Sequence, residues 1–135
     1  MLSTEKETVY LRTLPMWSFG FAQIRLSRTM LDKSIIDANK SVRDLALNFG
    51  IDFDKMKNGD KYEVEARFDN PERYHQEKSV VRFYKTINRG DRRVSIKGIK
   101  QYVEIGDLIA LSACLPKDDN KDIIIINVTK GANYE

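Results

Sequence analysis

Short segments in which apolar and polar residues alternate recur through this chain. The clearest example spans residues 61–68, where Tyr62, Val64, Ala66 and Phe68 alternate with charged side chains. A period of two places the apolar side chains on one face of an extended strand and the charged ones on the other. A strand of this kind must cover its apolar face with other strands or with a helix. The chain is therefore predicted to be mainly β.

Six further segments have strand character, at residues 9–14, 23–26, 77–85, 93–97, 107–115 and 122–128. The last one contains four consecutive isoleucines, Ile123 to Ile126, and this run predicts a central strand that is covered on both faces. Residues 15–21 are rich in aromatics and contain Gly20, and we expect them to form a loop between the first two strands.

Two short helices are predicted between these strands. Ser27 is a candidate N-cap for a helical turn over residues 28–32. A second helix has Asp37 or Asn39 as its N-cap and ends at Gly50. Its apolar residues recur at helical spacing and form one stripe, Val42, Leu45, Ala46 and Phe49. The elements do not alternate as in a Rossmann-type sheet. The predicted fold is mainly β with short helices, a seven-stranded open pseudobarrel.

The same pattern precedes two of the predicted strands. Residues 53–60 and 99–107 each form a short amphipathic stretch that ends in Gly-Asp, and a strand begins directly after it. Glycine permits unusual backbone angles, and aspartate can bond to its local backbone. The pair indicates internal pseudo-symmetry. Coincidence is the alternative, because Gly-Asp before a strand is common.

Positive charge is concentrated in residues 82–100, which read RFYKTINRGDRRVSIKGIK. This stretch holds seven Lys or Arg and a single acid, whereas the whole chain has a net charge of only +3. A short basic loop between two strands predicts a phosphate-rich partner. Arginine pairs bidentately with phosphate or with guanine, asparagine reads adenine or shapes the turn, and aspartate accepts from cytosine or stabilises the turn. The candidate contacts are Lys85, Asn88, Arg89, Asp91, Arg92, Arg93 and Lys97.

A second group of candidate contacts flanks the aromatic segment and consists of Arg12, Trp17, Ser18, Gln23, Arg25 and Arg28. The aromatics of this segment are either exposed for stacking or folded into the core. We expect at least one of Trp17, Phe19 and Phe21 to be in the core.

Residues typical of catalysis and metal binding are scarce. The chain has one histidine, His75, and one cysteine, Cys114, which lies in an apolar run and is expected to be a buried structural thiol. Asp60, Glu63 and Glu65 approach the pattern of a nuclease but lack a lysine at the required place. We therefore expect no enzyme activity, no metal and no cofactor.

The 135 residues fit one domain, with a core over about residues 9–128. No secretion signal is visible, and no apolar run approaches the roughly 20 residues that span a bilayer. We expect a cytoplasmic protein without a membrane partner. The linker-like residues 129–135 favour the N-terminal part of a longer protein.

The order of these elements resembles the DNA-binding pseudobarrel of plant B-three transcription factors. It includes a strand that ends in Leu26-Ser27-Arg28, a helix and a basic hairpin with Arg89-Gly90-Asp91-Arg92-Arg93. Restriction systems of the EcoRII and LlaJI types use this pseudobarrel as a target-recognition domain. The resemblance covers roughly residues 9–128 and implies two arms that grip the major groove, at about residues 14–23 and 85–93.

The resulting hypothesis is sequence-specific binding of double-stranded DNA by the recognition domain of a restriction system or a regulator. Cleavage or translocation would then belong to nuclease or motor domains or subunits elsewhere. Two alternatives stay open. One is an RNA or single-strand binding barrel that uses Trp17, Phe83, Tyr84 and Tyr102 for stacking. The other is a protein-interaction module whose basic loop docks an acidic partner.

Overall fold

The computed structural model describes residues 16–70, 75–116 and 121–130. Within these ranges the chain forms six strands: β1 (Met16–Arg25), β2 (Lys61–Asn70), β3 (His75–Lys85), β4 (Arg92–Ile96), β5 (Leu108–Pro116) and β6 (Ile123–Thr129). It also forms the α-helices α2 (Arg28–Lys33) and α3 (Lys40–Leu47) and the short 3-10 helices η1 (Phe53–Lys55) and η3 (Ile99–Gln101).

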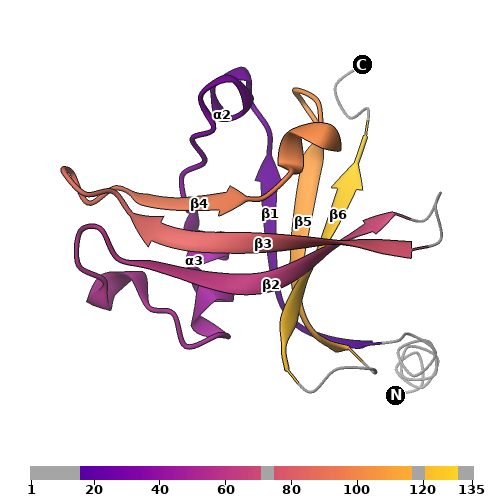
Figure 1. Cartoon of the computed structure of the whole chain (residues 1–135), viewed down its shortest axis with the longest axis horizontal. Coiled ribbons are helices and arrows are strands. Elements are labelled where there is room, and N and C mark those ends of the chain that lie inside the picture. Colours follow the sequence, from indigo (N-terminus) through magenta and orange to yellow (C-terminus); the bar gives the residue numbers. More distant parts are fainter. Residues whose placement is uncertain (1–15, 71–74, 117–120, 131–135) are drawn as a thin grey trace.

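The six strands form one curled sheet in the order β1-β5-β6-β2-β3-β4. All neighbours are antiparallel except β2 and β6, which are parallel. In Figure 1, β1, β5 and β6 lie roughly upright and β2, β3 and β4 cross them, which gives a half-barrel. The prediction of a mainly β fold with short helices is confirmed.

The prediction of seven strands is not confirmed. The expected strand at residues 9–14 lies outside the described residues. The expected loop at residues 15–21 is wrong from Met16 onward, because Met16 to Arg25 form the single strand β1. A register shift between Ser18 and Gly20 bends this strand, and a Cβ at Gly20 would overlap the Asn48 side chain after α3. Gly20 therefore allows a close approach of the helix and does not mark a loop.

The core fills the inside of the curl. Phe83, Leu111, Ile124 and Ile126 are fully buried there, and α3 packs against β1 and adds its apolar stripe. All four isoleucines of β6 are buried, and β6 lies between β5 and β2. The prediction of a central, doubly covered strand is confirmed.

Both predicted helix caps are confirmed. The Ser27 side chain accepts a hydrogen bond from the Met30 amide, and the Asn39 side chain accepts one from the Val42 amide. Each bond satisfies a backbone donor that the first helical turn leaves without a partner. Of the two candidates for the second helix, Asn39 is the N-cap.

The segment before α3 covers the two edges of the sheet. On the β4 side, Ala38 donates to the Arg92 carbonyl at 3.0 Å and Ile36 accepts from the Val94 amide at 2.9 Å. On the β1 side, the Asn39 carboxamide donates to the Gln23 carbonyl at 3.1 Å, and the Gln23 amide donates to the Ser41 hydroxyl at 3.3 Å. These contacts occupy edge groups that otherwise pair with another chain.

No helix in the described part of the chain is long and apolar enough to cross a bilayer.

Candidate functional site

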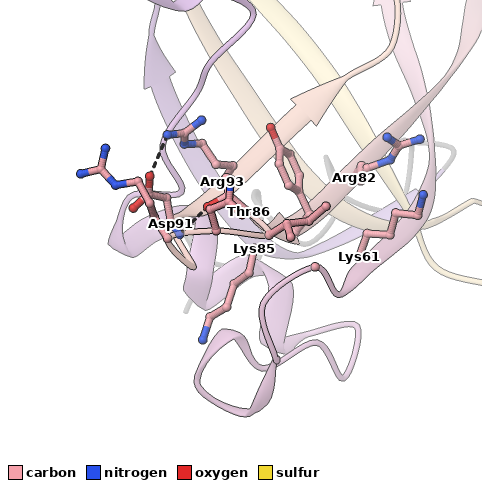
Figure 2. Close-up of a pocket in the computed structure, with 11 residues that line it drawn as sticks. Lys61, Arg82, Lys85, Thr86, Asp91 and Arg93 are labelled. Atoms are coloured by element: carbon pink, nitrogen blue, oxygen red, sulfur yellow. Dashed lines mark hydrogen bonds and ion pairs between the residues drawn. The ribbon is translucent and has the colours of Figure 1, made fainter.

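A pocket of about 500 Å³ lies between the β3–β4 turn and the outer face of β2, β3 and β4 (Figure 2). Five of the residues that line it are basic and one is acidic. The basic residues are Lys61, Arg82, Lys85, Arg89 and Arg93, and the acid is Asp91. The candidate site therefore includes the basic turn predicted from the sequence, together with the sheet face beside it.

The strand register explains how the floor of this pocket forms. Tyr84 lies opposite Lys61 of β2 and opposite Arg93 of β4. Residues directly opposite each other in an antiparallel ladder project from the same face. Arg82 shares that outer face because it lies two residues before Tyr84. Phe83 lies between them, points inward and is fully buried.

The turn from Thr86 to Asp91 is fixed by three hydrogen bonds. The Thr86 amide donates to the Asp91 carbonyl at 3.0 Å, and the Asp91 amide donates to the Thr86 hydroxyl at 2.9 Å. The Gly90 amide also donates to the Thr86 carbonyl at 3.1 Å. Gly90 has a φ of +70°, and a Cβ there would overlap the Asn58 carboxamide. The turn therefore packs closely against the segment of this chain that precedes β2 and contains Asn58.

Arg93 is held between two carboxylates. Its Nη2 lies 3.0 Å from Asp91 Oδ2, and its Nε lies 3.2 Å from Asp37 Oδ1. The Asp91 contact is a hydrogen bond, whereas the Asp37 contact is an ion pair without hydrogen-bond geometry at Nε. Only 19% of the Arg93 side chain is exposed. Arg93 therefore joins β4 to the turn and to the segment before α3.

Arg82 is also held by an acid. Its Nε and Nη2 both donate to Glu63 Oε2 across the β2–β3 ladder, at 3.0 and 2.7 Å. Lys85 is occupied in another way, because its Nζ donates to the Met56 carbonyl at 3.1 Å. Figure 2 shows the Lys85 side chain extending away from Arg82 and Arg93. Lys85 is thus a structural contact more than a part of the pocket's charged surface.

Lys61 and Arg89 differ from these residues, because both are exposed and neither has an acid partner among the described residues. Arg92 is exposed, with its Nη1 3.8 Å from Asp54 Oδ1. Asn88 is exposed at the turn, and Lys97 is exposed in an adjoining depression that Arg82 also lines. The charge available to a partner therefore lies at the rim of the pocket.

None of the described members of the second predicted group lines this pocket. Arg12 lies outside the described residues, and Trp17 and Ser18 lie at the start of β1, where side chains are not described. In Figure 1 the start of β1 and the β3–β4 turn lie at opposite ends of the molecule. The start of β1, which belongs to the first arm that the resemblance implies, therefore lies apart from the turn of the second arm.

The remaining residues of that group lie along β1 and α2. Gln23 is exposed and uses its backbone groups to bond to Asn39 and Ser41. Arg25 is exposed, and its Nη1 donates to the Gly106 carbonyl at 2.9 Å. Arg28 is exposed at the start of α2. Of the aromatics in the segment, Phe21 is 54% exposed, and the side chains of Trp17 and Phe19 lie outside the description.

The candidate contacts predicted for DNA left out six residues of the pocket, namely Gly59, Lys61, Arg82, Tyr84, Thr86 and Ile87. Tyr84 was predicted only as a stacking residue of the RNA-binding alternative, and Arg82, Thr86 and Ile87 were included only as members of the basic stretch. Alternation along β2 and β3 places Lys61, Arg82 and Tyr84 on outer faces. The register between the two strands was needed to show that these residues meet, and the sequence did not supply it.

The carboxylates that approach a nuclease pattern serve other roles. Asp60 accepts from the Lys57 amide at 2.9 Å, and Glu65 lies 2.9 Å from Lys121 Nζ. Among the described residues, no three His, Cys, Asp or Glu side chains are grouped as a metal site. Cys114 is buried as predicted, and this burial raises the pKa of its thiol to about 11. The thiol therefore stays protonated at neutral pH.

No protein-family model, curated protein or solved structure matches this chain. The interpretation of the site depends on its own geometry.

Proposed function

We propose that this domain binds double-stranded DNA in a sequence-specific way and serves as the recognition module of a restriction system. The observation that carries the proposal is the group of cations around the β3–β4 turn, in which Lys61 and Arg89 are exposed without an acid partner in the described part of the chain. Phosphate contacts from such side chains release counterions from DNA and supply sequence-independent affinity.

The two paired arginines suit the same role. Arg82 and Arg93 keep their positive charge while Glu63, Asp91 and Asp37 fix their positions. A fixed guanidinium loses less conformational entropy when it binds phosphate than a mobile one does. These arginines therefore offer fixed N–H donors beside Lys61 and Arg89, while the neighbouring acids balance their charge.

The shape of the hairpin supports recognition of bases. A two-stranded β-ribbon fits the major groove of B-DNA, where every base pair presents a distinct pattern of donors and acceptors. Figure 1 shows the β3–β4 turn projecting from the edge of the molecule. Asn88 and Arg89 are exposed at this turn, so we assign Asn88 to a base edge and Arg89, together with Lys61, to the phosphate backbone.

The proposal depends on the hairpin arm alone. The first arm predicted from the resemblance is a strand from Met16 onward and lies far from the turn. A single arm would position the duplex, and any cleavage or translocation would come from other nuclease or motor domains or subunits.

The test is selection from a random-sequence duplex pool at a series of salt concentrations, followed by sequencing of the bound fraction. We expect binding that weakens steeply with salt and a short enriched motif. Asn88→Ala should reduce the enrichment at one position, whereas Lys33→Ala on α2 should not change it.

Competitors in the same assay separate the alternatives. Stronger competition by single-stranded DNA or RNA would favour a single-strand binding barrel. Absence of binding to any nucleic acid at low salt would contradict the proposal and favour an acidic protein partner. Salt-sensitive binding without an enriched motif would leave a backbone binder and contradict sequence recognition.

A further inference from the structure

The pocket has features that phosphate binding does not require. Phosphates lie on the outside of a duplex and are reached by exposed cations on a convex or flat surface. Here a hollow of about 500 Å³ lies behind the cations, and its lining includes Tyr84 and Ile87. An aromatic and an aliphatic side chain in a basic hollow favour an apolar, planar group attached to an anion.

Tyr84 lies in the middle of the pocket's floor. It lies between Lys61 and Arg93 in the cross-strand row, and Arg82, two residues earlier, is on the same face of β3. Its side chain is partly exposed, in contrast to the buried Phe83 beside it. An aromatic ring with cations on both sides provides a surface on which a base can stack while its phosphate is neutralised.

Ile87 lies on the wall of the pocket. It is 76% exposed, the highest value among the large hydrophobic residues of the described chain. The hydrogen bonds between Thr86 and Asp91 hold the turn that carries it, and its Cγ1 lies 3.6 Å from the position of a Cβ at Gly59. Contact between this apolar side chain and water is unfavourable in the unbound protein. A contact that covers Ile87 in a complex is therefore favourable.

We propose that this pocket binds one nucleobase that has left the stack of the bound DNA. The base lies on Tyr84 and against Ile87, and the flanking phosphates contact Lys61 and Arg89. This inference depends on the proposed function, because it names the part of the DNA that enters the site. The volume lies within the usual range for sites that bind a small molecule, about 300–1,000 Å³, and suits a single base.

A base inside the duplex cannot make these contacts. Both of its faces are covered by its neighbours in the stack, so Tyr84 can cover a face only after the base has swung out. Extrusion costs unstacking and unpairing energy, and this cost is smallest where the base is already unpaired. The pocket therefore predicts tighter binding to a duplex in which the recognised base has no pairing partner.

The test compares three versions of one selected duplex at each base position of the recognised site in turn. The first is fully paired, the second places an abasic residue opposite the tested base, and the third makes the tested position itself abasic. Binding of the full chain is measured by fluorescence anisotropy. At one position we expect the second duplex to bind about tenfold tighter than the third, because only the second retains a base that can stack on the tyrosine.

Three variants test the role of Tyr84 at that position. Tyr84→Ala should remove the difference between the second and third duplexes, and Tyr84→Phe should retain it. Tyr62→Ala is the matched control, because Tyr62 is 48% exposed on β2 and does not line this pocket. Circular dichroism and thermal melting establish that each variant is folded.

The outcomes separate this inference from the proposed function. Equal binding of the second and third duplexes at every position, with binding to paired DNA intact, would overturn the inference alone. A difference that persists in folded Tyr84→Ala would also overturn it. Absence of binding to any of the three duplexes would contradict the proposed function and the inference together.

Discussion

Two turns in this molecule share one local structure and serve different parts of the fold. The first ends at Asp60 before β2, and the second ends at Asp107 before β5. In each turn the amide three residues before the aspartate donates to its Oδ2, at 2.9 Å from Lys57 and 2.8 Å from Glu104. The glycine before each aspartate has a positive φ, +91° in the first turn and +93° in the second.

The same pair of backbone bonds fixes each turn to a neighbouring segment. In the first, the Gly59 amide donates to the Lys85 carbonyl and the Lys85 amide donates to the Asp60 carbonyl, both at 3.0 Å. In the second, Gly106 and Asp107 form the equivalent bonds with Leu26, at 2.8 and 2.9 Å. The similarity of the two Gly-Asp units that the sequence indicates is therefore confirmed at the level of hydrogen bonds.

The two turns differ in their surroundings. Asp107 is only 2% exposed and also accepts from Lys130 Nζ at 2.9 Å, whereas Asp60 is partly exposed and its turn borders the pocket. Beyond Leu26 the chain enters α2, and beyond Lys85 it enters the basic turn. One motif thus fixes the end of β1 in the core of the fold and the end of β3 beside the candidate site. The local motif sets the backbone, and its position in the sheet decides whether it serves stability or binding.

The largest effect that tests this comparison is expected at Asp107. Asp107→Ala removes a buried carboxylate that accepts from the Glu104 amide and from Lys130 Nζ, and it should lower the free energy of unfolding by about 2–3 kcal/mol. Asp107→Asn should cost less, because its carboxamide oxygen can still accept from the Glu104 amide. Urea denaturation measures both values, and a loss below about 1 kcal/mol for the alanine variant would show that burial does not distinguish this turn.

The two glycines should behave alike. Gly59→Ala and Gly106→Ala each force a side chain into a positive φ and should each cost about 1–2 kcal/mol of stability. At Gly59 the added Cβ meets only an ordinary contact, 3.6 Å from Ile87 Cγ1, so backbone strain should dominate. Thermal melting of the two variants side by side is the measurement. A neutral result for either glycine would break the proposed equivalence of the turns.

A smaller effect is expected at Asp60. Asp60→Ala removes the acceptor of the Lys57 amide at a partly exposed position and should cost about 1 kcal/mol. The same variant should weaken DNA binding, because the turn that carries Lys61 is no longer fixed. Urea denaturation and anisotropy on the same samples report both effects. A stability loss as large as that of Asp107→Ala would contradict the difference in burial.

The smallest effect is expected at Arg25, which donates to the Gly106 carbonyl from an exposed position. Arg25→Ala should lower stability by about 0.5 kcal/mol and leave the affinity for DNA unchanged. The Arg25→Lys variant keeps the charge but loses the planar fork, and it serves as the control. A loss of affinity similar to that of Arg89→Ala would extend the interface to the β1 side and add the first arm that the resemblance implies.

Much of the fold was predictable because periodicity reports burial directly. The alternation in β2, the isoleucine run in β6 and the caps at Ser27 and Asn39 all predicted the observed elements. The strand at Met16 to Phe21 was not predictable by this means. Its Gly20 makes room for Asn48, and a glycine that allows a tertiary contact looks the same in sequence as one that forms a loop.

The site was predictable only in part, for a related reason. Clustering of charge along the chain located the basic turn. Whether each cation is free depends on acids that are distant in sequence, as Asp37 is from Arg93 and Glu63 is from Arg82. Lys61 lies in the site because the register of β2 against β3 places it opposite Tyr84. The sequences of two strands do not by themselves determine this register.

The most direct test of the central claim is the salt dependence of binding to one fixed duplex. Wild type, the double variant with Lys61→Ala and Arg89→Ala, and the control Lys33→Ala would be compared by anisotropy. Loss of two cationic contacts with DNA should reduce the slope of log affinity against log salt by roughly two units in the double variant, and the control should match wild type. Equal slopes and equal affinities in all three proteins would contradict the account.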